Sequence, residues 1–228
     1  MTGTGVLHLT GPTHLADLGT FLGRATRIDP GGLVRLRADQ HGRTIAAYTR
    51  LPFGVLVGRT VPGTLSGVSG AVDVTVGAAD LAAGIAADLA GGATRGLALP
   101  GRRDAQWRGS LPPAGGWRRL DLVPVASLRR VVAAGVRAFE AAQRRAADPR
   151  AAQGAANALL DQGALTVSDD RDTAVLALRV CHAAWRMGFL GEDDGVDCSV
   201  SVSGRWARLA APFGSAYRDP AGVSLLAP

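Results

Sequence analysis

Apolar and polar positions in the first quarter of the chain follow two different periods. In residues 15–27, leucines three and four positions apart predict an amphipathic helix. Residues 33–38 and 43–50 alternate between apolar and polar side chains, which predicts two strands of a β-hairpin. A Pro-Phe-Gly bend then leads into a third predicted strand over residues 55–61.

The middle of the chain combines short strands with helices. Residues 72–76 alternate as a strand does, and the alanine-rich residues 78–90 predict a helix. A long helix is expected over residues 127–147, with Asp148-Pro149 at its end. The glycine-rich residues 62–70 and 101–116 are expected to be loops, and residues 97–99 a short strand.

The C-terminal part repeats the change from helix to strands. Helices are expected over residues 152–160 and from Asp170 to about Phe189, the second with Trp185 on its buried face. Alternating residues 196–202 and 205–210 predict a hairpin. Two more strands are expected, one at residues 215–218 and one after Gly222.

Both ends of the chain therefore offer a helix, a hairpin with Gly-Arg at its turn, a Pro-Phe-Gly bend and another strand. This order predicts an α+β fold with two lobes, antiparallel β-meanders at both ends and a helical middle. It fits an internal duplication, and chance convergence of two ordinary hairpins is the alternative. The lobes are expected at residues 1–124 and 125–228, or they form one continuous domain.

The basic residues raise the question of whether the chain binds negatively charged groups. All 25 of them are arginine, and the formal net charge is +6. Arginine is favoured for recognition of phosphates and carboxylates, yet abundant alanine, glycine and proline point to GC-rich coding as the simpler cause. No secretory signal and no run of ~18 apolar residues is found, so we expect a cytoplasmic protein without a membrane segment.

Several short blocks resemble an uncharacterised protein family of high-GC actinomycetes. The blocks are Ile28-Asp29-Pro30, Val34-Arg35-Leu36, Leu51-Pro52-Phe53-Gly54-Val55-Leu56, Gly116-Trp117, His182-Ala183-Ala184, Gly188-Phe189-Leu190 and Pro212-Phe213-Gly214-Ser215. The resemblance implies a bacterial protein and carries no activity, substrate or catalytic residue.

No catalytic or metal-binding motif is recognised. Cys181 and Cys198 fall on apolar faces, and adjacent Cys181 and His182 point to different sides of a helix, which is poor geometry for one metal ion. We therefore expect no metal and no cofactor. An enzyme of unknown class stays an alternative, with a site assembled around Trp107-Arg108-Gly109-Ser110 and Trp117.

Two groups of basic residues are the candidate binding sites. On the long helix, arginines recur every seven residues and form one stripe. On the later helix, two arginines and a histidine at positions i, i+3 and i+7 could hold an anion. The stripe consists of Arg130, Arg137 and Arg144, and the second group of Arg179, His182 and Arg186.

These residues favour a non-catalytic interaction or regulatory protein with an arginine-lined face for an acidic partner or an anion. The partner is another protein or a second copy of the chain. Nucleic acid is the alternative, because the helices at 152–160 and 170–189 and the following hairpin imitate a winged helix-turn-helix.

Overall fold

A computed structural model of the chain describes residues 5–67, 73–92 and 96–218. The chain forms two compact units, and each is described by itself. The first unit comprises Met1–Pro52 and Leu56–Ala114, and the second comprises Phe53–Val55 and Gly115–Pro228. The predicted division into domains at residues 124 and 125 stays a prediction.

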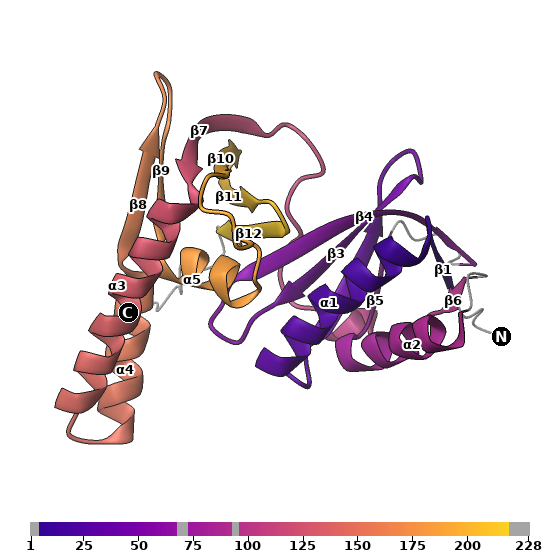
Figure 1. The fold of residues 1–228 in the computed structure, drawn as a ribbon, viewed down its shortest axis with the longest axis horizontal. Coiled ribbons are helices and arrows are strands. Elements are labelled where there is room, and N and C mark those ends of the chain that lie inside the picture. The colour runs from indigo at the N-terminus through magenta and orange to yellow at the C-terminus, as the bar shows by residue number, and fades with distance from the viewer. Residues whose placement is uncertain (1–4, 68–72, 93–95, 219–228) are drawn as a thin grey trace. The chain divides into compact units, whose positions relative to one another are not determined.

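The first unit is an antiparallel sheet with two helices packed beside each other (Figure 1). Its strand order is β5-β2-β3-β4, and the end of β4 also pairs with β1, which pairs with β6. The elements are β1 (Val6–Leu9), α1 (Pro12–Ile28), β2 (Leu33–Ala38), β3 (Thr44–Arg50), β4 (Leu56–Ser66), β5 (Asp73–Gly77), α2 (Ala78–Gly91), β6 (Leu97–Ala98) and the 3₁₀ turn η1 (Asp104–Gln106).

The apolar pattern places the core of this unit as predicted. In β2, Val34 and Leu36 are fully buried, and the intervening Arg35 points to the other face of the sheet. Helix α1 buries its leucine face and packs closely against α2. A Cβ at Gly19 would lie 2.9 Å from Ile85, so glycine permits this close helix contact.

One expectation for this unit was wrong. Strand β4 runs to Ser66, where a loop was expected, because the unpredicted strand β1 pairs with Gly63–Ser66. Residues 101–116 form the expected loop, apart from the 3₁₀ turn η1. The loop is anchored to the sheet, because Asp104 Oδ1 accepts a hydrogen bond of 2.7 Å from the Thr75 amide and Trp107 is only 9% exposed.

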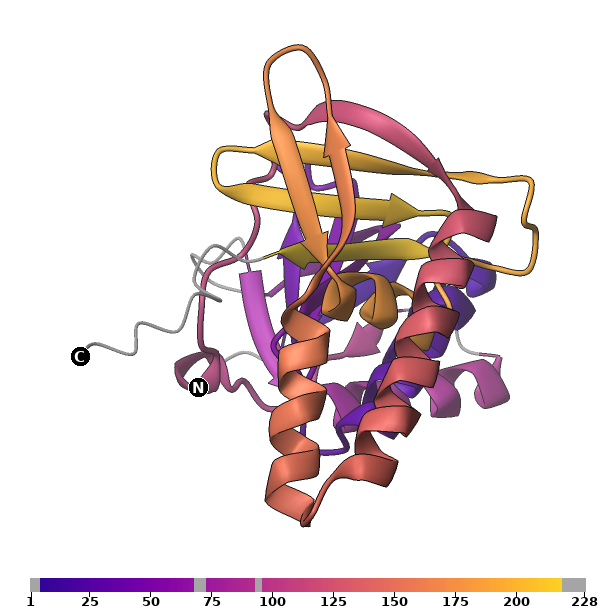
Figure 2. The same cartoon turned by 90° about the vertical axis from the view of Figure 1, so that its left-hand side faces the viewer.

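The second unit has the strand order β12-β11-β10-β7, and α5 packs against β11, β12 and α3. Figure 2 shows α3 and α4 as an antiparallel pair, with the β8–β9 hairpin as a separate ribbon. The elements are β7 (Arg118–Pro124), α3 (Val125–Arg145), α4 (Pro149–Asp161), β8 (Gly163–Ser168), β9 (Thr173–Ala177), α5 (Leu178–Arg186), β10 (Asp197–Ser203), β11 (Trp206–Ala211) and β12 (Gly214–Arg218).

The helix predicted from residue 170 to 189 is wrong in its first half. Residues 173–177 form β9, which pairs with β8, and only residues 178–186 are helical. Asp169 does not cap a helix: its Oδ1 accepts hydrogen bonds from the amides of Arg171 and Asp172 in the turn between these strands. Because a hairpin separates α4 from α5, the predicted winged helix-turn-helix does not form.

The predicted α+β architecture is confirmed. The order α1-β2-β3-β4 in the first unit recurs as α5-β10-β11-β12 in the second, and both sheets are antiparallel. The strand expected after Gly222 lies outside the described residues.

Candidate functional site

Helix α3 has an apolar face and, on the opposite side, a face lined by arginines. Leu128 and Val132 are buried, and the Gly135 backbone lies so close to Leu178 of α5 that a Cβ there would meet its side chain at 2.6 Å. Positions 130, 137 and 144 lie on the opposite side of the helix, since each is rotated by roughly 140–180° from position 135. The stripe of Arg130, Arg137 and Arg144 is therefore formed as the sequence predicted, and all three are exposed.

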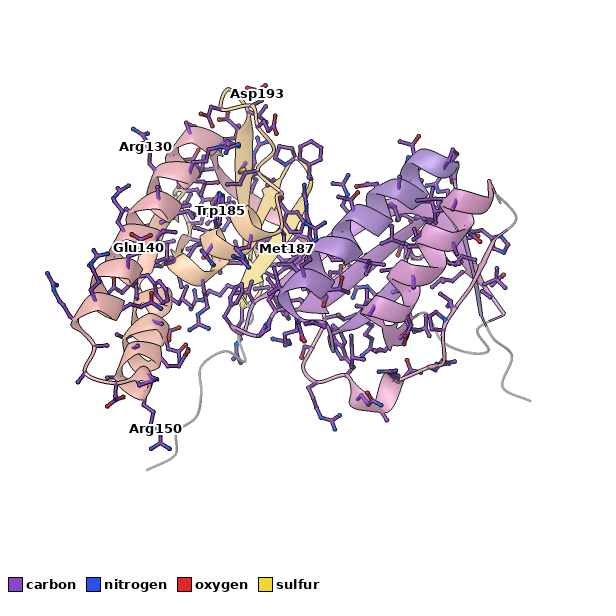
Figure 3. All side chains as sticks on the ribbon, turned by 60° about the horizontal axis from the view of Figure 1, so that its bottom comes forward. Arg130, Glu140, Arg150, Trp185, Met187 and Asp193 are labelled. Atoms are coloured by element: carbon purple, nitrogen blue, oxygen red, sulfur yellow. The ribbon has the colours of Figure 1, made fainter. Side chains whose placement is uncertain are left out.

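In the described part of the chain these three arginines form no ion pair, although Glu140 lies three residues from Arg137 and four residues from Arg144 on the same helix. Arg130 donates a 3.0 Å hydrogen bond from Nη2 to Ser127 Oγ. Within residues 5–67, 73–92 and 96–218, no carboxylate forms an ion pair with Arg130, Arg137 or Arg144. Figure 3 shows Arg130 and Glu140 on α3 and Arg150 at the start of α4. The stripe, hereafter the α3 arginine face, exposes three guanidinium groups.

The neighbouring Arg129 is used differently. Its Nε lies 2.8 Å from Asp194 Oδ1, and its Nη2 donates to the Gly191 carbonyl. Arg129 thereby holds the loop between α5 and β10 against the start of α3. Adjacent arginines on one helix thus differ in role, and the pairing with Asp194 distinguishes them.

The predicted group on α5 is divided by the structure. The Arg179 guanidinium donates to the Phe53 carbonyl and pairs with Asp161, which commits it to contacts within the second unit. The His182 ring lies between Phe53 and Trp185, with centroids 5.8 and 5.7 Å away. Arg186 is exposed. Burial, and to a smaller degree the Arg186 charge, lowers the pKa of His182 below its usual value.

Trp185 lies on the surface, where the apolar spacing did not predict it. Its side chain was expected in the core, yet it is 42% exposed and packs on His182. Its spacing from Leu178 and Cys181 suggested burial, and the signal that α5 ends at Arg186 was Gly188, which has a φ of 63° just after the helix. Exposed tryptophan beside arginine is typical of binding surfaces.

The two cysteines lie in the core of the second unit. Burial raises the pKa of the Cys181 and Cys198 thiols to about 11, so both are protonated at neutral pH. Among the residues that the structure describes, no group of three or more His, Cys, Asp or Glu side chains is arranged to hold a metal ion.

The tryptophans of the alternative enzyme site have structural contacts. Trp107 Nε1 donates a 3.0 Å hydrogen bond to the Gly109 carbonyl in the first unit, and the Arg35 guanidinium lies 5.8 Å from its ring. Trp117 belongs to the second unit, where Arg208 lies 4.5 Å from its ring. Each indole therefore serves as a stacking surface for an arginine.

Two family matches divide the sequence between them. Residues 2–109 match a family described as a domain of unknown function (DUF8010). Residues 112–223 match a second domain of unknown function (DUF8185). No curated protein sequence matches the chain. Within the described part of the chain, no helix combines the length and hydropathy needed to cross a bilayer.

The fold is similar to that of bacterial sliding clamps. The beta sliding clamp of Caulobacter crescentus superposes with a TM-score of 0.51 at 11% identity, covering 96% of this chain and 65% of the clamp. The DnaN sliding clamp of Bartonella birtlesii, bound to griselimycin, gives 0.51 at 11% identity, covering 95% and 64%. The chain thus spans about two thirds of the clamps' length, and the likeness concerns the fold alone.

Proposed function

We propose that this chain is a non-catalytic, cytoplasmic interaction protein whose α3 arginine face binds an acidic protein partner. The observation that carries the proposal is the exposure of Arg130, Arg137 and Arg144 without an ion pair in the described structure. Arginines that serve the fold, such as Arg35 and Arg59, are paired with aspartates instead.

The geometry of the face suits an extended acidic surface. Seven residues of helix rise ~10 Å, so the three guanidinium groups span roughly 20 Å along one line. Guanidinium groups bind carboxylates through paired hydrogen bonds, and exposed charges steer a partner of opposite sign. Salt weakens such contacts, so affinity is expected to fall as ionic strength rises.

Nucleic acid is the second candidate, because the structural neighbours are described as DNA polymerase sliding clamps. An arginine line also suits phosphates, and counterion release would make binding strongly salt-dependent. The winged-helix argument no longer supports this candidate. Fluorescent poly-glutamate and a 30-base-pair DNA duplex, titrated in parallel, distinguish the two.

The test reverses the charge of the α3 arginine face. Arg130→Glu, Arg137→Glu and Arg144→Glu together are expected to weaken poly-glutamate binding, measured by fluorescence anisotropy, by about tenfold or more. The control combines Arg27→Glu, Arg43→Glu and Arg171→Glu, three exposed arginines elsewhere, with the same change in net charge. Equal losses in both variants would show that total charge, not the α3 arginine face, controls binding. Light scattering of the same samples tests self-association of the chain.

A further inference from the structure

Residues 192–197 lead into β10 and concentrate negative charge on the surface of the second unit. Four of the 19 acidic residues of the chain lie within these six positions, and all four are exposed: Glu192, Asp193, Asp194 and Asp197. Within the part of the chain that the structure describes, only Asp194 among them forms an ion pair, with Arg129 of α3. These residues, hereafter the acidic loop, are opposite in charge to the α3 arginine face.

An exposed aromatic ring lies beside the acidic loop. Phe213 is 51% exposed, and its ring lies so close to Gly191 that a Cβ at that glycine would meet it at 2.7 Å. Gly191 directly precedes the acidic loop in the chain. Protein interfaces typically combine aromatic side chains at the centre with a polar rim, and Phe213 with the acidic loop has both components.

The α3 arginine face has the matching features. Ala133 lies between Arg130 and Arg137 in the chain and is exposed. Four residues of an α-helix turn by about 400°, so Ala133 is rotated by only about 40° from Arg137 around the helix axis. Its short side chain leaves a shallow space between the two arginines, and an aromatic ring in that space can contact a guanidinium group through a cation–π interaction.

A chain cannot cover the whole of its α3 arginine face with its own acidic loop. The ion pair of Arg129 with Asp194 holds the loop at the start of α3, and Figure 3 places Asp193 and Arg130 at the same end of the unit. Arg144 lies 14 residues beyond Arg130, which is roughly 20 Å along the helix. The far end of the face is therefore accessible only to the acidic loop of another molecule.

We infer that the α3 arginine face binds a second copy of this chain, whose acidic loop and Phe213 ring lie on the arginines. The inference rests on the proposed function, since it names the acidic partner of the same face. Every copy carries both surfaces, so each contact joins the face of one copy to the loop of another. At physiological salt, charges more than roughly 8 Å apart are largely screened, which weakens the repulsion between two copies of net charge +6 more than the direct contacts.

Sedimentation velocity of the full chain, over a concentration series at 100 and 500 mM NaCl, measures the self-association. The wild type is expected to associate at 100 mM and to dissociate at 500 mM, because salt weakens ion pairs. The triple variant of the α3 arginine face is expected to stay monomeric, whereas the control with Arg27, Arg43 and Arg171 changed to Glu is expected to associate as the wild type does. A wild type that stays monomeric at both salt concentrations, or association that survives in the triple α3 variant, overturns the inference.

An exchange of charge between the two surfaces identifies the contact. Glu192→Arg, Asp193→Asn and Asp197→Arg together change the charge of the acidic loop from −4 to +1. The Asp193→Asn change keeps the side-chain oxygen that accepts a 2.8 Å hydrogen bond from the Gly195 amide. This loop variant is expected to be monomeric alone and to associate when mixed with the triple α3 variant, because the unchanged face of one then meets the unchanged loop of the other. Circular dichroism checks that both variants are folded, and a mixture of folded variants that stays monomeric overturns the inference.

Phe213→Ala separates the inference from the proposed function. Loss of the exposed ring is expected to weaken self-association by about tenfold and to leave poly-glutamate binding unchanged, since that probe needs only the arginines. Self-association as strong as that of the wild type would exclude the ring from the contact. A monomeric wild type that binds poly-glutamate through the α3 arginine face overturns this inference alone, whereas poly-glutamate binding that survives in the triple α3 variant overturns the proposed function.

Discussion

Arginine has different roles in the sheet of the first unit and on helix α3 of the second unit. In the sheet, Arg35 pairs with Asp73 at 2.8 Å, and Arg37 donates to Tyr48 and to the Pro112 carbonyl. On α3, Arg137 and Arg144 are exposed and have no ion pair in the described structure. In a chain whose basic residues are all arginine, the surroundings of each guanidinium, rather than its identity, separate structural residues from candidate binding residues.

The largest expected effect on stability belongs to the sheet. Arg35→Ala removes an ion pair with two hydrogen bonds to Asp73 and the stacking on Trp107. The free energy of unfolding is expected to fall by about 1–3 kcal/mol, because both charged groups are only about a quarter exposed. Urea denaturation of this variant, of Asp73→Ala and of the double variant measures the coupling. Additive losses would contradict the pairing.

A smaller loss of stability is expected for a change in the second unit. Arg118 pairs with Asp169 and Asp172 and so holds the turn of the β8–β9 hairpin. Arg118 and Asp172 are more exposed than Arg35 and Asp73, so Arg118→Ala is expected to lower the free energy of unfolding by about 0.5–1 kcal/mol. Amide hydrogen exchange should accelerate in residues 163–177 and stay unchanged in α3. Exchange that rises equally throughout the unit would indicate a general loss of stability instead.

The pH dependence around His182 is expected to be weaker still. Because its pKa in the folded chain is lowered from 6.5, the unfolded state binds the proton more readily, and stability falls as pH drops below that value. His182→Gln is expected to lose less stability than the wild type between pH 7 and pH 5 in matched urea titrations. Parallel losses in the two proteins would exclude a contribution of this imidazole.

The smallest effect is expected on α3. Single changes Arg130→Glu, Arg137→Glu or Arg144→Glu should alter the free energy of unfolding by no more than about 0.5 kcal/mol each, as is usual at exposed positions without an ion pair. Thermal melts followed by circular dichroism provide the measurement. A loss comparable to that of Arg35→Ala would place these arginines among the structural ones.

Much of the fold was predictable from local periodicity. Helices α1, α2 and α3 and the hairpin β2–β3 follow from apolar spacing, since each buries one face. The β8–β9 hairpin was missed because Ser168-Asp169-Asp170 suits both a helix start and a tight turn. The ion pairs of Asp169 and Asp172 with Arg118, which is distant in the sequence, favour the turn.

The candidate site was predictable only in part. The line of Arg130, Arg137 and Arg144 follows from helical geometry alone, because an amphipathic helix exposes its polar positions. The engagement of Arg179 by Asp161 and the Phe53 carbonyl depends on contacts between distant segments.

Salt dependence of acidic-probe binding tests the difference between structural and available arginines most directly. Poly-glutamate is titrated at 50, 100 and 200 mM NaCl into the wild type, the triple α3 variant and the matched triple control. The wild type and the control are predicted to bind with affinity that falls with salt, and the α3 variant to lose about tenfold or more at the lowest salt. Equal affinity of the α3 variant and the wild type would contradict the assignment of Arg130, Arg137 and Arg144 as binding residues.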